Sequence, residues 1–145
     1  MRPSHDFFMK WAHDVAKCST CAKIQVGSVL VKDSRVLSIG YNGVSSGDKH
    51  CCEHWETHPY SLEAHAVFSE QNELHSEQNA ILDALKRGVS VEGATLYTTH
   101  SPCFACAKVI LSCGIKRVFY THVYKKESIA FLETHGIDVV WYYTT

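Results

Sequence analysis

Long hydrophobic runs are missing from this sequence, and so is an excess of charge of either sign. No stretch approaches the roughly 20 apolar residues of a membrane span, and charged residues interrupt the apolar positions of the N-terminus, unlike a signal peptide. The 14 basic and 15 acidic residues give a net charge of −1, which offers no electrostatic attraction for nucleic acid. We therefore expect a cytoplasmic protein that binds a small molecule, and neither a membrane nor nucleic acid.

Interdomain linkers, repeats and low-complexity tracts are also lacking. The 145 residues are enough for one hydrophobic core and too few for two ordinary domains, and the 46% hydrophobic content is close to the globular average. We expect residues 1–145 to form a single domain. Regular periodicity disappears at about residues 44–74, where cysteine and histidine are dense, so we interpret this stretch as an insertion without clear structure.

Cysteine and histidine are the unusual components of the chain. It has seven cysteines and ten histidines. An odd number of cysteines without a secretion signal argues against a disulfide framework, and favours metal ligands, reactive thiols or small buried side chains. Metal binding is the first hypothesis to test against the motifs.

The hydrophobic pattern outside the insertion predicts alternating helices and strands. Helices are expected over residues 4–17, 73–88, 101–114 and 127–136, and strands over residues 25–31, 35–41, 94–100, 116–121 and 138–143. The first two strands read as a hairpin around "KDSR", whereas the later strands alternate with helices and should pair in parallel. The expected fold class is α/β, with a mixed five-stranded sheet between helical layers.

One candidate metal motif is "SPCFAC". Ser101 is a suitable N-cap and Pro102 a suitable first helical residue, so Cys103 and Cys106 should lie on one face of the first turn. The positive end of the helix dipole favours thiolate, which is the form that binds zinc. Alone, this motif fits a redox pair or half of a structural zinc site equally well.

The second motif is "HSE" at the start of the helix expected over residues 73–88. His75 can bind a metal while Glu77 stands beside it as a base, and two cysteines plus one histidine leave a zinc position open for a water whose pKa falls toward about 7. A His-x-Glu sequence by itself usually consists of surface residues without a catalytic role. Followed about 25 residues later by Pro-Cys-x-x-Cys, it is the signature of zinc nucleoside and nucleobase deaminases. Adjacent parallel strands should bring both helix starts to one sheet edge.

With these motifs in place, the sequence resembles the deoxycytidylate (dCMP) deaminases of bacterial and phage type, within the zinc-dependent cytidine and deoxycytidylate deaminase family. The matching segments run along nearly the whole chain: "STC", "QVGSVLVKDSRVLSIGYNG", "HSEQNAI", "SPCFACAKVI", "GIKRVFY" and "YK". The resemblance implies a three-layer α/β/α cytidine-deaminase-like fold and hydrolytic deamination of dCMP to dUMP and ammonia, feeding dTMP synthesis. It implies a catalytic Zn²⁺ on His75, Cys103 and Cys106, Glu77 as the proton shuttle, and substrate contacts by Asn42, Glu73 and Tyr120.

The resemblance also implies a second, structural Zn²⁺ that would clamp the insertion. Its expected ligands are Cys21, Cys51 and His65, with His58 as the fourth and His54, Cys52 and His50 as alternatives. Relatives form homo-oligomers, often hexamers, and some are activated by dCTP and inhibited by dTTP, with Mg²⁺ accompanying the regulatory nucleotide. The chain departs from the family at Ser76, where alanine is usual, and it lacks the proline that often follows "GYNG".

Several alternatives stay open at the level of sequence. A tRNA adenosine deaminase or a cytosine deaminase would share both zinc motifs, although the near-neutral charge and the long insertion favour a nucleotide enzyme. A non-catalytic structural zinc-binding module is possible, as is a redox role for Cys18 and Cys21. The cation or amide that would contact a phosphate cannot be chosen among Lys23, Gln25, Arg35, Lys125 and Lys126.

Overall fold

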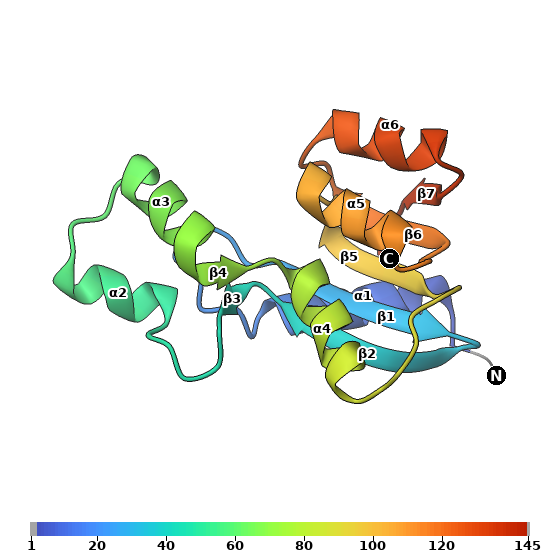
Figure 1. Cartoon of the computed structure of the whole chain (residues 1–145), viewed down its shortest axis with the longest axis horizontal. Coiled ribbons are helices and arrows are strands. Elements are labelled where there is room, and N and C mark those ends of the chain that lie inside the picture. The colour runs from blue at the N-terminus through green and yellow to red at the C-terminus, as the bar shows by residue number, and fades with distance from the viewer. Residues whose placement is uncertain (1–2, 145) are drawn as a thin grey trace.

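The computed structural model describes residues 3–144 and has a mixed five-stranded sheet at its centre (Figure 1). The strands are β1 (Gly27–Lys32), β2 (Arg35–Tyr41), β5 (Thr95–His100), β6 (Arg117–His122) and β7 (Asp138–Trp141), in the spatial order β2-β1-β5-β6-β7. Strand β1 pairs antiparallel with both neighbours, whereas β5, β6 and β7 are parallel. The expected sheet is therefore confirmed, including the hairpin and the two crossover connections.

Helices cover both faces of the sheet. Helix α1 (His5–Ala16) packs on one face, and α4 (Ser76–Lys86), α5 (Phe104–Ser112) and α6 (Lys126–Thr134) pack on the other (Figure 1). The alternation along β1 explains the two cores, because Val29 and Val31 face α1 while Leu30 faces α4. The expected three-layer α/β/α architecture is confirmed. None of the helices within residues 3–144 combines the length and apolar character needed to cross a membrane.

Glycines allow two helices to lie directly on the strands. A Cβ atom at Gly27 would lie 2.1 Å from the carbonyl oxygen of Ala12 in α1, and one at Gly40 would lie 2.3 Å from the carbonyl oxygen of Ser76 in α4. No side chain fits at either position without displacing a helix. The contact at Gly40 fixes the first turn of α4 against β2.

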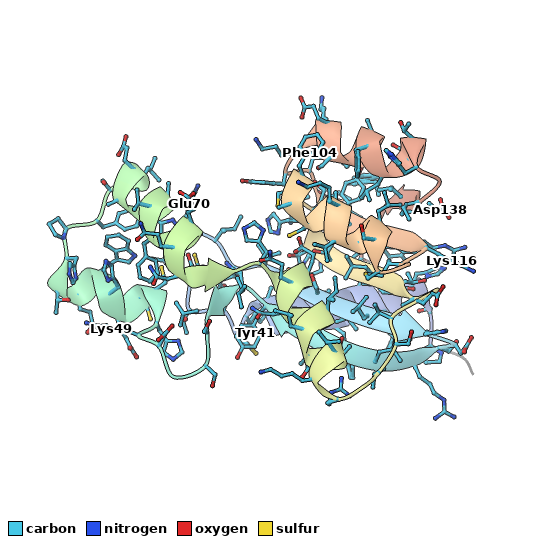
Figure 2. The ribbon with its side chains drawn as sticks, in the orientation of Figure 1. Tyr41, Lys49, Glu70, Phe104, Lys116 and Asp138 are labelled. Atoms are coloured by element: carbon cyan, nitrogen blue, oxygen red, sulfur yellow. The ribbon has the colours of Figure 1, made fainter. Side chains whose placement is uncertain are left out.

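The insertion is more ordered than the sequence suggests. It contains β3 (Gly43–Val44), α2 (Cys51–Thr57), α3 (Leu62–Asn72) and β4 (Glu73–Leu74), and it projects from the sheet (Figure 1). The loss of periodicity in the sequence therefore does not correspond to a loss of regular structure. Side chains of α2 and α3 fill the space between the two helices (Figure 2). Trp55 of α2 is centred 5.8 Å from Phe68 of α3 and 5.1 Å from Tyr60 in the connection between them. Because only a few aromatic rings join these two short helices, the sequence has no extended apolar stripe from which the helices could be predicted.

Two helix boundaries also differ from expectation. Glu73 and Leu74 belong to β4, so α4 begins at Ser76 with His75 as its N-cap. Helix α5 begins at Phe104 with Cys103 as its N-cap, and Ser101 does not cap it. The hydroxyl of Ser101 instead accepts a hydrogen bond from the backbone N–H of Tyr124 at 2.7 Å, which ties the segment after β6 to the site.

Candidate active site

Two helix starts meet at the carboxyl end of β5. Strands β2 and β5 run in the same direction, and β1 lies between them, so the expected adjacency of two parallel strands is wrong. Helix α4 packs over both β2 and β1, which brings its first turn across to the start of α5. The side chains at these two starts therefore face one another.

His75, Cys103 and Cys106 form a compact cluster at this junction. The His75 Nδ1 atom lies 3.2 Å from Cys106 Sγ and 3.4 Å from Cys103 Sγ, and all three ligand atoms lie within 4.8 Å of one another. Nitrogen and sulfur ligands of a tetrahedral zinc ion are about 3.6 Å apart, given ordinary bond lengths. Two thiols and an imidazole fit a zinc ion and leave one coordination position open.

The surroundings of the cluster favour thiolate at Cys103. The N–H of Cys106 points at Cys103 Sγ over 3.5 Å, which is the N-cap contact of α5. Hydrogen bonding from Cys106, and then from His75, lowers the pKa of Cys103 to about 4. The same pairing with Cys103, followed by burial and the charge of Glu77, raises the pKa of Cys106. Cysteine binds zinc as thiolate, so metal binding at this cluster would release protons.

Glu77 lies beside the cluster in the first turn of α4. Its side chain is almost fully buried, with the residue 4% exposed, and its Oε1 accepts a hydrogen bond from Ser76 Oγ at 2.5 Å. A buried carboxylate without a cation partner is costly and is found mostly where chemistry needs it. Its location supports the role predicted for a proton-transferring group.

A cavity of about 550 Å³ opens onto this cluster. Of the residues predicted to contact substrate, Asn42 and Glu73 line it and Tyr120 does not. Tyr120 is a buried residue of β6, whereas Tyr124, two residues beyond that strand, lines the cavity. Lining residues that the sequence did not single out as site residues include His100 and Tyr124. The tyrosine of "YK" was the available signal for Tyr124. Lys23, one of the five phosphate-contact candidates, also lines the cavity, and nothing in the sequence separated it from the other four.

Asn42 lines the cavity and fixes the backbone of the segment before β1. Its Oδ1 accepts from the backbone N–H of Val26 at 2.9 Å, and its Nδ2 donates to the carbonyl oxygen of Ile24 at 2.9 Å. An amide side chain has four hydrogen-bonding positions, so one donor and one acceptor position of Asn42 are left over. The residue both shapes the segment before β1 and keeps hydrogen-bonding capacity for a ligand.

A second cluster joins the insertion to the sheet and consists of Cys21, Cys51, His65 and Glu73. The Cys21 sulfur lies 3.3 Å from His65 Nε2 and 3.7 Å from Glu73 Oε1. Burial raises the pKa of Cys21 to about 11. Among residues 3–144, Glu73 Oε2 is the buried side-chain oxygen or nitrogen left without a hydrogen-bond partner. An orphaned carboxylate oxygen beside two thiols and an imidazole fits a four-ligand cation site.

The composition of this second cluster corrects the expected fourth ligand. His58 does not join it, because its ring stacks on that of His54 with 4.1 Å between centroids and its Nδ1 lies 3.0 Å from the His54 carbonyl oxygen. Glu73 stands in the fourth place, with its carboxylate against Cys21 and His65. Because Glu73 also lines the cavity, its predicted contact with substrate stays a prediction.

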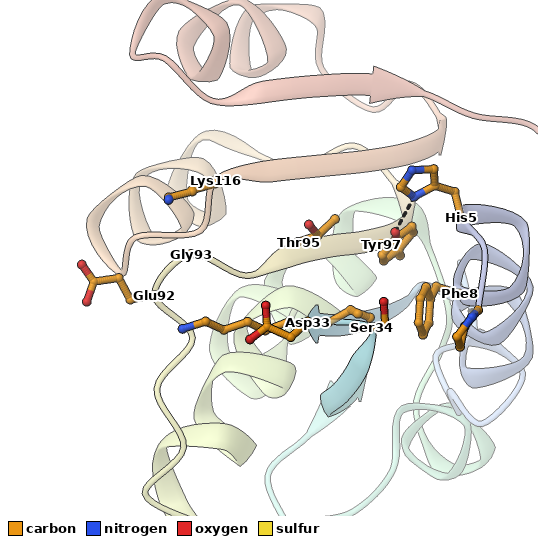
Figure 3. Close-up of a pocket in the computed structure, with 12 residues that line it drawn as sticks. His5, Phe8, Asp33, Ser34, Glu92, Gly93, Thr95, Tyr97 and Lys116 are labelled. Atoms are coloured by element: carbon orange, nitrogen blue, oxygen red, sulfur yellow. Dashed lines mark hydrogen bonds between the residues drawn. The ribbon is translucent and has the colours of Figure 1, made fainter. Parts of the chain in front are cut away.

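A cavity of similar size, about 580 Å³, lies at the opposite edge of the sheet (Figure 3). Phe8, Lys32, Glu92 and Lys116 line it, and His5 Nδ1 lies 2.6 Å from the Tyr97 hydroxyl there. Within the part of the chain that the structure describes, no group of three metal-ligating side chains lies at this edge. The candidate chemistry is confined to the edge that carries the two clusters.

Comparison with known proteins agrees with this geometry. Residues 2–122 match the family described as "Cytidine and deoxycytidylate deaminase zinc-binding region". ComE operon protein 2 of Bacillus subtilis (strain 168) is 36% identical over 137 residues, which cover 93% of this chain and 69% of that protein. The deoxycytidylate deaminase of Enterobacteria phage T4 is 34% identical over 162 aligned residues, covering 88% of this chain and 84% of that protein.

A solved structure gives the same result. The dCMP deaminase of cyanophage S-TIM5 in complex with dCMP and dUMP superposes with a TM-score of 0.78 at 34% identity, covering 93% of each chain. The matched region contains both helix starts and the cluster between them. This chain therefore belongs to the zinc-binding cytidine and deoxycytidylate deaminase family.

Proposed function

We propose that this protein catalyses the hydrolytic deamination of dCMP to dUMP and ammonia. The observation that carries the proposal is the cluster of His75, Cys103 and Cys106, open on one side to a cavity of about 550 Å³ that also contains the buried carboxylate of Glu77. Two relatives support the choice of substrate, because one is named a deoxycytidylate deaminase and another was solved with dCMP and dUMP bound.

The three ligands and Glu77 divide the work. His75, Cys103 and Cys106 would hold the zinc ion, which when bound supplies a water of lowered pKa and hence a nucleophile at neutral pH. Glu77 accepts a proton from the attacking water and delivers it to N3 of cytosine, which makes C4 electrophilic. It then carries a second proton from the added hydroxyl to the amino group, which leaves as ammonia. Both protons start on water, so the products balance.

Substrate orientation falls to side chains at the cavity wall. Of the five phosphate-contact candidates considered from the sequence, Lys23 alone lines the cavity. We assign it to the 5′-phosphate, as a point charge that needs no fixed geometry. Asn42 has one donor and one acceptor position left for the nucleotide, and the ring of Tyr124 provides an apolar wall.

The second cluster is proposed to hold a structural Zn²⁺ on Cys21, Cys51, His65 and Glu73. Four protein ligands leave no coordination position for water, so the role would be structural and not catalytic. The ligands come from the loop before β1 and from α2, α3 and β4. A metal there would tie the projecting helices to the sheet, which their few mutual aromatic contacts do little to secure.

Removing a ligand of this second site should loosen the insertion. We expect Cys51→Ala to lose one zinc per chain and to lower the unfolding temperature by about 10 °C, because structural metal binding adds directly to folding free energy. The matched control is Cys52→Ala, since Cys52 is exposed and lies outside both clusters. Zinc analysis and calorimetry measure both effects. If the Cys51→Ala variant still binds two zinc ions per chain, Cys51 is not a zinc ligand and the proposed second site is wrong.

Further properties belong to the same proposal. The dUMP product would feed dTMP synthesis. With Mg²⁺ present, dCTP would act as activator and dTTP as inhibitor in a cytoplasmic homo-oligomer such as a hexamer. Exposed aromatic residues such as Phe7, Trp11 and Trp141 provide apolar surface for assembly. We further propose that residues 1–145 constitute one deaminase domain, with the insertion at about 44–74 as part of it.

A substrate panel tests specificity and regulation together. The decrease in ultraviolet absorbance should be large with dCMP and small with dCTP, cytidine, cytosine and tRNA, since only dCMP offers both the base and a single phosphate for Lys23. Addition of dCTP should increase the rate, and addition of dTTP should decrease it. If the protein deaminates cytosine or tRNA adenosine faster than dCMP, the proposed substrate is wrong and the faster-reacting compound takes its place.

A further inference from the structure

A chain of buried hydroxyl groups leads from the sheet to Glu77. Ser28 on β1 and Ser76 on α4 are both fully buried, at 0% exposure, and their Oγ atoms lie 2.7 Å apart. Ser76 Oγ in turn donates to Glu77 Oε1 at 2.5 Å. Ser28 occupies the face of β1 that also carries Leu30 in the core.

The direction of the chain follows from the number of protons. A serine hydroxyl has one proton, and Ser76 gives its proton to the carboxylate. The proton between the two serines must then come from Ser28, which makes Ser76 an acceptor from Ser28 and a donor to Glu77. Hydrogen bonds in such a chain polarise one another in the same sense, which strengthens the bond at the carboxylate end.

The backbone around Ser76 cannot shift to relax this arrangement. The Ser76 carbonyl would lie 2.3 Å from a Cβ atom at Gly40, so the first turn of α4 is pressed against β2. Asn79 Nδ2 also donates to the Tyr41 carbonyl oxygen at 2.7 Å, which ties the same turn to the end of that strand. With the main chain fixed, the hydroxyl chain restricts rotation of the Glu77 carboxylate.

We infer that Ser76, supported by Ser28, is a positioning residue for Glu77: it holds Oε1 and leaves Oε2 as the oxygen that exchanges protons with water and substrate. This inference rests on the proposed deaminase function for its kinetic consequence and on the hydrogen-bond geometry for its structural one. A carboxylate that must first accept and then deliver a proton gains from a fixed orientation, since small misplacements of reacting groups slow the chemical step.

The test compares Ser76→Ala, Ser28→Ala and the double variant with wild type. Alanine is usual at this position in the family, so Ser76→Ala should leave Glu77 able to act, and loss of the hydrogen bond to its charge should reduce kcat by roughly 10-fold, with KM for dCMP changed less than about twofold. Ser28→Ala keeps the donor to Glu77 and should lose only a few-fold in kcat. The double variant leaves neither hydroxyl unpaired, so its unfolding temperature should recover toward wild type while its kcat stays at the Ser76→Ala level.

Ser38→Ala is the matched control. Ser38 is also buried and also donates to α4, at 2.8 Å to the Ala80 carbonyl oxygen, but it lies on the neighbouring strand β2 and bonds the helix backbone instead of the Glu77 carboxylate. It should change the unfolding temperature and leave kcat unchanged. If kcat recovers together with stability in the double variant, the serines are merely structural and the inference is wrong.

Crystal structures of the metal-free variants provide a readout that needs no activity. The Glu77 carboxylate should occupy one orientation in wild type and Ser28→Ala, and a displaced or divided one in Ser76→Ala. An unchanged carboxylate in Ser76→Ala would overturn the inference even if dCMP is deaminated. Wild-type protein that holds the carboxylate in place but does not convert dCMP would instead overturn the proposed function, with the positioning role intact.

Discussion

Glu77→Gln is expected to bind zinc normally and to lose at least about a thousandfold in kcat on dCMP. General acid and base catalysis contributes 10²–10⁴-fold, and Glu77 is assigned two successive proton transfers. Glutamine has nearly the same shape and can still accept from Ser76 through its carbonyl oxygen, so the buried hydrogen bond of 2.5 Å to Oε1 has a replacement. The amide has no exchangeable acid–base function at neutral pH. Steady-state kinetics, together with zinc analysis, measure the effect.

A matched control separates the role of Glu77 from a general loss of carboxylate charge. Glu92→Gln changes an exposed glutamate that lines the cavity at the opposite edge of the sheet (Figure 3). It should retain wild-type kcat and KM. Wild-type turnover in the Glu77→Gln protein would remove Glu77 from the mechanism.

Cys106→Ser should abolish activity by a different route, loss of the catalytic metal. Cys106 is 1% exposed, and its sulfur lies 3.2 Å from His75 Nδ1, so the replacement places a short, poorly ionised hydroxyl where a thiolate is needed. We expect the zinc content to fall by one equivalent per chain and turnover to drop below detection. The zinc proposed at the second cluster should stay bound.

Cys113→Ser is the control for this cysteine. Cys113 lies at the other end of α5, where its thiol contacts the Ile110 carbonyl oxygen at 3.5 Å, and it belongs to neither cluster. That variant should keep its full zinc content and its activity. Elemental analysis of the three proteins after gel filtration measures the difference, and full zinc occupancy in Cys106→Ser would take this residue out of the ligand set.

Much of the fold and of the first cluster could be predicted because the signals are local. Alternation and helical periodicity locate all five strands of the sheet and the four helices that cover it. The residues of the first cluster stand at helix starts, where a polar side chain without a core-packing reason is conspicuous, and the structure brings His75, Cys103 and Cys106 together. Their assignment as zinc ligands stays a prediction.

The rest depends on contacts between distant residues. Glu73 is the first residue of the helix predicted over residues 73–88, whereas in the structure it belongs to the two-residue strand β4 and its carboxylate faces Cys21 and His65 of other segments. The spacing of residues along the sequence cannot tell which of several histidines, or Glu73, is the fourth ligand of the second cluster. The link from Ser28 to Ser76 spans 48 positions and rests on one hydrogen bond, which no sequence pattern marks.

Deamination of dCMP in water enriched in oxygen-18 tests the central claim most directly. Water attack at C4, with Glu77 moving the protons, predicts one labelled oxygen in each dUMP molecule and one ammonia released for each dUMP formed. Mass spectrometry of the nucleotide and an enzymatic ammonia assay measure both quantities in the same reaction. Zinc-loaded protein that forms no dUMP, or forms dUMP without label, would contradict the assignment of this site as a hydrolytic deaminase centre.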